Sequence, residues 1–130
     1  MMEISLAPTQ IEQLTRLSRS SLPNESCAFL LGKNDRVVEI LAMQNADQSA
    51  ISFSIEPQEV LHAYDVAESK KLQVIGIFHS HPARPAPSNT DKKFMEINPV
   101  VWLIYSTTEQ EFKAYVYDSD VREVAVKITA

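Results

Sequence analysis

Two histidines stand one residue apart in His79-Ser80-His81, at the end of an apolar run, and a proline-rich loop leads from them to Ser88 and Asp91. Side chains two residues apart on a strand point to the same side, so both imidazoles can reach one metal ion. Neutral imidazole and carboxylate are suitable ligands for Zn²⁺, and three protein ligands with a fourth position left to water are typical of a catalytic zinc site. The spacing therefore indicates a metal site in which Asp91 is the natural third ligand.

The same residues also have simpler explanations. A His-x-His pair without a further ligand is more often incidental, and Ser88-x-x-Asp91 also matches the start of a helix, where a serine caps the first turn. Prolines at positions 82, 85 and 87 restrict the loop between the two groups, which lowers the entropic cost of holding one geometry. From the spacing alone, a metal site and a plain helix cap both remain open.

Composition narrows the class of protein. The chain has 130 residues, 45% of them hydrophobic and 22% charged, which predicts a single domain over residues 1–130. A net charge of -5 without a block of Lys or Arg argues against nucleic acid as a partner, and two glycines are too few for phosphate-cradling loops. With one cysteine, no signal peptide and no apolar run of membrane-spanning length, we expect a cytoplasmic protein without a membrane partner.

The elements that must position the site follow from the hydrophobic periodicity. Helices are predicted over about 9–20, opened by a capping box of Thr9 and Glu12, over about 57–70, and from Ser88 onward. Strand-like runs cover 4–6, 26–31, 37–41, 51–55, 72–78, 99–105, 111–117 and 121–128, the second and third forming a hairpin. Helices interrupt the strands rather than alternate with them, so we predict an α+β (mixed α/β) sandwich with a central, mostly antiparallel sheet, two main helices and a short third one.

A glutamate far upstream completes a recognisable pattern. Glu25 stands directly before the buried run of residues 26–31, which ends at Gly32. Together with His79-Ser80-His81-Pro82 and Ser88-x-x-Asp91, this segment resembles the JAMM (MPN+) zinc metalloprotease family, in the family's order and over nearly the whole chain. The resemblance implies the MPN/cytidine-deaminase-like fold.

The resemblance also implies a role for each residue of the pattern. It makes His79, His81 and Asp91 the ligands of one Zn²⁺, with water as the fourth. Glu25 is then the general base that shuttles a proton from this water to the leaving amine, and Ser88 stabilises the oxyanion.

Two positions depart from the family pattern. Six residues, 82–87, separate His81 from Ser88, one fewer than in many members, so the approach of Ser88 and Asp91 can differ in detail. Ala28 stands where glycine is common, and we expect local packing to tolerate it.

The family also suggests a substrate. Its members hydrolyse isopeptide or peptide bonds after the C-terminal tail of ubiquitin, ubiquitin-like modifiers or sulfur carriers. Such a tail can pair with a sheet edge, for which we predict the run Ile51-Ser52-Phe53-Ser54; an ordinary interior strand is the alternative. The short chain resembles compact archaeal or bacterial members, including desampylases and homologues of the proteasome-lid deubiquitinase, which leaves a proteasome as a further partner to test.

Three functions follow for testing. The leading one is a zinc-dependent isopeptidase acting on ubiquitin or a ubiquitin-like modifier. The second is a catalytically inactive MPN-type interaction scaffold, a branch that typically lacks the ligands retained here. The third is a small-molecule or peptide amide hydrolase that uses the same zinc site.

Overall fold

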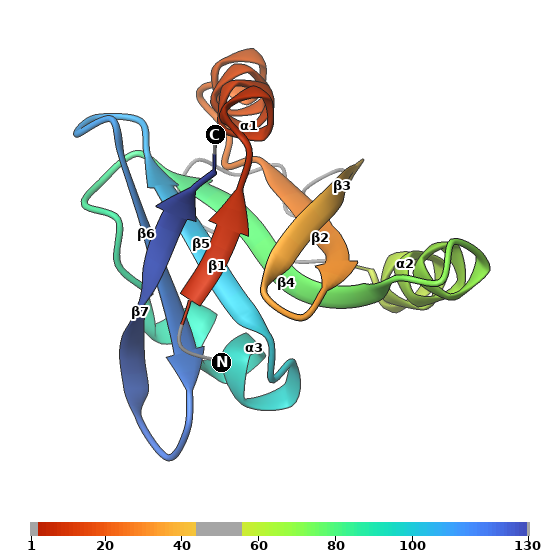
Figure 1. The fold of residues 1–130 in the computed structure, drawn as a ribbon. Coiled ribbons are helices and arrows are strands. Elements are labelled where there is room, and N and C mark those ends of the chain that lie inside the picture. Colours follow the sequence, from red (N-terminus) through yellow and green to blue (C-terminus); the bar gives the residue numbers. More distant parts are fainter. Residues whose placement is uncertain (1–2, 44–55, 130) are drawn as a thin grey trace.

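The structure, a computed structural model, describes residues 3–43 and 56–129 (Figure 1). Within these residues lie seven strands and three helices. The strands are β1 (Glu3–Leu6), β2 (Cys27–Lys33), β3 (Arg36–Met43), β4 (Gln73–His81), β5 (Val101–Ser106), β6 (Glu111–Tyr117) and β7 (Val121–Ile128). The helices are α1 (Pro8–Ser21), α2 (Pro57–Ser69) and α3 (Asn89–Ile97). The strand predicted over 51–55 falls outside the described residues.

The strands form one sheet that closes into a barrel in the order β1-β3-β2-β4-β5-β6-β7. β2 pairs antiparallel with β3 and β4, and β6 pairs antiparallel with β5 and β7, whereas β4–β5, β1–β7 and β1–β3 are parallel. The predicted α+β class is therefore confirmed, with most of these pairs antiparallel. The sequence did not predict that the sheet closes into a barrel. This closure depends on a bridge between Ser5 and Arg36 that joins β1 to β3.

Two apolar clusters lie on opposite faces of the sheet. The first draws on all seven strands and on α1, and so fills the barrel; its fully buried members include Ile4, Leu6, Leu14, Leu30, Phe78 and Leu103. The second lies on the outer face of β2, β4 and β5 and includes Ala63 and Ala67 of α2 and Met95 of α3. Figure 1 shows α1 at one end of the barrel, with α2 and α3 apart from it. The second cluster supports the candidate site.

The first helix begins earlier than the sequence pattern indicates. The predicted capping box of Thr9 and Glu12 is wrong, because α1 starts at Pro8 with Ala7 as its N-cap. Proline suits the first helical position, since its ring fixes φ and its missing N–H would have no helical partner there. The Gln10 side chain accepts a hydrogen bond from the Ala7 N–H (2.8 Å) and donates one to the Val37 carbonyl (3.0 Å), which ties α1 to β3.

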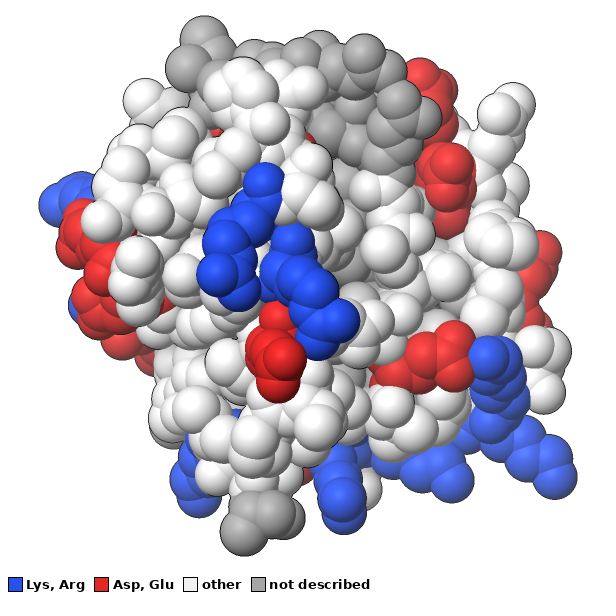
Figure 2. All heavy atoms as spheres, turned by 90° about the horizontal axis from the view of Figure 1, so that it is seen from above, with Lys and Arg blue, Asp and Glu red and all other residues white. Residues whose placement is uncertain are grey.

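Charged side chains of both signs are dispersed over the face of the molecule seen in Figure 2, where Lys and Arg lie among Asp and Glu. Arg16 pairs with Glu12 on α1 at 3.3 Å, and Lys70 joins Glu39 of β3 at 2.7 Å. Each of these exposed pairs contributes about 0–1 kcal/mol to stability. Among the described residues, none of the helices has the length and apolar character of a membrane span.

Candidate active site

Both histidines lie at the carboxyl end of β4, which extends past the predicted run to His81. His79 is held between Cys27 of β2 and Ile104 of β5, and His81 is opposite Ser106 of β5. The Thr107 N–H donates to the His81 carbonyl at 2.8 Å, which continues the β4–β5 pairing. His79 is fully buried and His81 is 8% exposed. The strand geometry that the His-x-His spacing requires is therefore present.

Asp91 reaches the histidines from the first turn of α3. Ser88 is the N-cap of this helix: its Oγ accepts from the Asp91 N–H (3.1 Å), and its own N–H donates to Asp91 Oδ2 (2.9 Å). The same Oδ2 lies 3.1 Å from His79 Nε2 and 3.2 Å from His81 Nε2. Ser88-x-x-Asp91 is therefore a helix cap, and the same capping box aims the Asp91 carboxylate at the two imidazoles.

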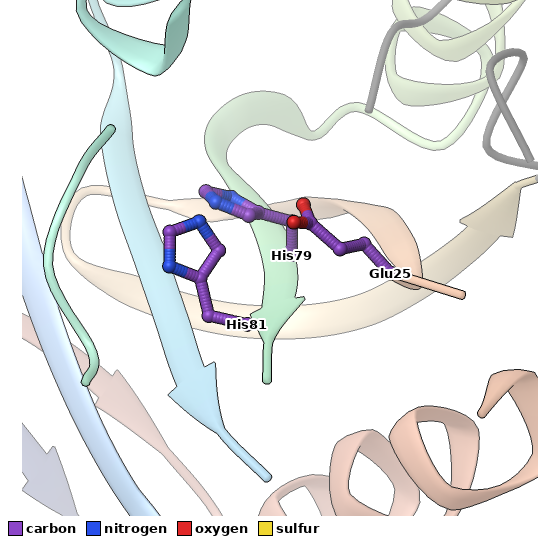
Figure 3. Close-up of side chains that lie close together, drawn as sticks. All are labelled: Glu25, His79 and His81. Carbon is purple, nitrogen blue, oxygen red and sulfur yellow. The ribbon is translucent and has the colours of Figure 1, made fainter. Parts of the chain in front are cut away.

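Glu25 joins the cluster from the segment between α1 and β2. It is only 3% exposed, and its carboxylate and the ring nitrogens of His79 and His81 offer ligand atoms that all lie within 4.8 Å of one another. Figure 3 shows the three side chains projecting into one space, Glu25 from one side and the two rings from β4. Four of the predicted site residues, Glu25, His79, His81 and Asp91, are therefore brought together, with Ser88 directly beside Asp91.

Burial and hydrogen bonding set the charges of the cluster. Burial alone would raise the pKa of Asp91, but its hydrogen bonds with His79 and His81 outweigh burial and hold that pKa well below its usual range. Burial lowers the pKa of His79 below 6.5. Burial also acts to lower the pKa of His81, but the hydrogen bond to Asp91 and the charge of Glu25 raise it above 6.5. Near neutral pH the cluster therefore combines an ionised carboxylate with a neutral imidazole, the forms that bind metal.

The donor set fits a zinc ion. Two imidazoles and a carboxylate are ligands of catalytic zinc, and ligands bound at about 2.0–2.2 Å in tetrahedral geometry lie roughly 3.4 Å apart. The distances from Asp91 Oδ2 to His79 Nε2 and His81 Nε2, 3.1 and 3.2 Å, are close to that separation. A second carboxylate, that of Glu25, has a ligand atom within 4.8 Å of those of both histidines.

Supporting residues of this cluster come from β5 and β6, and the motif gave no signal for them. Trp102 of β5 meets the His79 ring edge-on, with ring centroids 6.0 Å apart. Tyr115 of β6 donates its hydroxyl to the carbonyl of Pro85, in the loop that follows His81, at 2.8 Å. Only the fold brings Tyr115 to a loop 30 residues earlier in the chain.

An apolar pocket of about 460 Å³ adjoins the cluster between α2 and α3. Its floor is Ile77 and Trp102, next to His79, and its walls include Val60 and Leu61 of α2 and Phe94 and Ile97 of α3. Leu61 and Ile97 are 66% and 73% exposed, so the rim of the pocket is apolar and open to solvent.

The remaining sequence predictions have mixed outcomes. Ile51, Ser52, Phe53 and Ser54, predicted to bind substrate, lie outside the described residues. The short loop over 82–87 still delivers Asp91 to both histidines. Ala28 is fully buried in the cluster that fills the barrel, where its methyl group is accommodated as expected.

Fold and site together define a protein of the JAB/MPN class. The chain belongs to the JAMM (JAB/MPN) family: residues 8–118 match the family described as prokaryotic homologs of the JAB domain. It is similar to the desampylase of Pyrococcus furiosus, with 40% identity over 110 residues covering 84% of this chain and 78% of the relative. The desampylase of Haloferax volcanii is 28% identical over 111 residues, covering 82% and 79%.

Solved structures agree on the fold. The solution structure of a protein from Desulfitobacterium hafniense superposes with a TM-score of 0.85 at 34% identity, covering 97% of this chain and 92% of that one. A JAB1/MPN domain protein from Archaeoglobus fulgidus has a TM-score of 0.65 at 19% identity, covering 97% and 99%. At 19% identity, the second comparison is evidence for the fold alone.

Proposed function

We propose that this protein is a zinc-dependent isopeptidase that removes or processes a ubiquitin-like modifier at its C-terminal tail. One observation carries the proposal: Glu25, from a distant part of the sequence, forms one buried cluster with His79 and His81, the same two histidines that Asp91 contacts. Two imidazoles with two carboxylates supply both a metal-binding set and a separate base. A simple helix cap would explain Asp91 but not the buried Glu25.

The residues divide the chemistry among themselves. His79, His81 and Asp91 would hold the zinc ion, which supplies a Lewis acid and brings the pKa of a bound water towards about 7. Glu25 accepts the proton of the attacking water and later donates it to the leaving amine. The Ser88 hydroxyl accepts from the Asp91 N–H and keeps its own proton to donate to the oxyanion, whose charge appears only as the reaction proceeds.

The names of two relatives support the choice of substrate. Both are called desampylases, a name for enzymes that remove a ubiquitin-like modifier, and the first shares 40% of its aligned residues with this chain. We propose that an extended modifier tail pairs with the run Ile51-Ser52-Phe53-Ser54, which the sequence predicts as a sheet edge. The one cysteine, Cys27, is buried and free, which suits a reducing compartment, and we place the enzyme in the cytoplasm.

The decisive experiment compares Glu25→Gln with Glu12→Gln, an exposed glutamate on α1. Both variants should bind about one zinc per chain. Glu25→Gln should cleave a modifier fusion at least about 100-fold more slowly, because it loses the proton shuttle, whereas Glu12→Gln should match the wild type. Cleavage by Glu25→Gln at the wild-type rate would refute the base assignment, and full zinc occupancy in His79→Ala would refute the metal assignment.

A further inference from the structure

Three buried hydrogen bonds join Ser26 to Ser80, the residue between the two histidines. The Ser26 N–H donates to Ser80 Oγ at 2.8 Å, and the Ser26 hydroxyl donates to the same oxygen at 2.9 Å. In the third bond the Ser80 N–H donates to the Ser26 carbonyl at 3.0 Å. Ser26 and Ser80 are 3% and 2% exposed, so solvent water supplies few of the hydrogen bonds that their polar groups need.

The position of this Ser26–Ser80 contact explains what it does. The β2–β4 ladder pairs Cys27 with His79, and one step further places Ser26 opposite Ser80. Here β2 has not yet begun, and the acceptor for the Ser26 amide is a side-chain hydroxyl rather than a strand carbonyl. The hydroxyl thus extends the attachment to β4 by one residue beyond the strand.

Glu25 is the residue directly before Ser26, so the contact controls where its carboxylate lies. Side chains alternate between the faces of a strand, which puts Ser26 and Ser80 on one face and Cys27, His79 and His81 on the other. Continuing the alternation turns Glu25 toward the histidines, as Figure 3 shows. Ser80 therefore faces away from the histidines but fixes the backbone that presents Glu25 to them.

We propose that Ser80 is a positioning residue for the general base: its hydroxyl holds Ser26, and through it Glu25, in register with His79 and His81. The proposal rests on the proposed function only for the role of Glu25 as base. The hydrogen-bonded attachment itself is observed in the structure. A displacement of about 1 Å at a reacting group costs roughly 100-fold in rate, so a loosened attachment should reduce kcat.

The attachment can be tested without activity, by amide hydrogen exchange on the full chain. Ser80→Ala removes the acceptor of the Ser26 amide, so this amide should exchange at least about 10-fold faster than in the wild type. The Asp91 amide, which donates to the hydroxyl of Ser88, is an internal control and should keep its rate. Ser80→Thr retains a hydroxyl and should restore protection. Unchanged exchange of Ser26 in Ser80→Ala would overturn the proposal.

The catalytic consequence is tested on zinc-loaded protein with a modifier fusion. Ser80→Ala should lower kcat by about 10- to 100-fold at unchanged KM and zinc content. Ser26→Ala keeps the hydrogen bond from its backbone N–H to the Ser80 hydroxyl, so its kcat should fall less. Ser18→Ala is the matched control, since Ser18 is a fully buried serine bonded within α1. It should leave kcat unchanged while sharing any general loss of stability.

A double variant separates positioning from a general defect. If Ser80 acts through Glu25, Ser80→Ala should cause little further loss in single turnovers of Glu25→Gln, because the two changes remove the same contribution. Multiplied losses would overturn the proposal. If the wild type cleaves no modifier fusion, the proposed function fails, while the exchange rate of the Ser26 amide still decides whether Ser80 holds this segment.

Discussion

One oxygen atom, Asp91 Oδ2, takes part in two structures at the residue scale. It accepts from the Ser88 N–H in the cap of α3, and it lies within 3.2 Å of a nitrogen of both histidines. A substitution of Asp91 therefore disturbs helix and site together. Ser88 allows the two contributions to be separated, because glycine is a tolerated N-cap without a hydroxyl.

We expect Ser88→Gly and Ser88→Ala to differ from each other in stability but to lose the same amount of activity. Alanine should cost about 1 kcal/mol of unfolding free energy and glycine only a few tenths, since glycine leaves the start of the helix less strained. Both lack the hydroxyl that we propose donates to the oxyanion, so both should lose about 100-fold in kcat. Urea unfolding and steady-state cleavage measure the two effects. Wild-type turnover by Ser88→Gly would reduce Ser88 to a helix cap.

The buried thiol of Cys27 predicts a loss of stability in alkali. Burial first, and then the charges of Glu59 and Glu25, raise its pKa from 9.0 to about 12. Between these values the unfolded chain has released the thiol proton and the folded chain still holds it. Unfolding is then favoured as pH rises, by at most about 1.4 kcal/mol per pH unit from this residue.

The measurement is urea unfolding of the wild type and Cys27→Ala at several pH values above about 8, where the unfolded thiol begins to ionise. Other groups titrate in both proteins, so the difference between the two slopes isolates the thiol. The alanine variant should be less stable near neutral pH but should lose less stability as pH rises. Parallel slopes would show that the Cys27 thiol ionises at the same pH in the folded and the unfolded chain.

At the scale of elements, the site is the junction between β4 and α3. The sequence was sufficient to predict both: the apolar run ending in His79-Ser80-His81 predicted the strand, and Ser88 with Asp91 predicted the helix start. It was not sufficient to predict how the loop over 82–87 is held, because that support comes from β6. A hydrogen bond from Tyr115 to Pro85 leaves no local pattern in either segment.

Tyr115→Phe should weaken metal binding through this loop. The variant keeps the ring but removes the hydrogen bond to Pro85, and so loosens the loop that connects His81 to Ser88 and Asp91. Loss of such outer support typically lowers metal affinity about 10- to 100-fold. Tyr117→Phe, also on β6, is the control and should bind zinc like the wild type. Competition with a chelating dye measures both, and equal affinities would show that Tyr115 does not support the site.

At the scale of the whole molecule, the barrel core and the site belong to different faces of the sheet. Alternating runs such as 111–117 were enough to predict strands, and the α+β class followed from their order. Barrel closure was not predictable, because β1 and β7, the first and last strands, pair in parallel across the length of the sequence. No short-range periodicity records which distant strands become neighbours.

Leu6 and Ile128 offer a matched test of this separation, since they are partners in the β1–β7 ladder. Leu6 is fully buried in the barrel and Ile128 is 61% exposed. Leu6→Ala should cost about 2–5 kcal/mol of unfolding free energy, and Ile128→Ala less than about 0.5 kcal/mol. Zinc affinity of the folded protein should be unchanged in both. A large loss of affinity in Leu6→Ala would mean that the two faces are coupled.

Trp102 gives the protein an optical probe of its own. It is the one tryptophan of the chain, its ring meets His79 edge-on, and it also forms part of the floor of the apolar pocket between α2 and α3. Its intrinsic emission therefore depends on the electrostatic field at the cluster and on the polarity of the pocket. Zinc titrations and substrate encounters can be followed by fluorescence on the unlabelled chain, with the two events reported by a single indole.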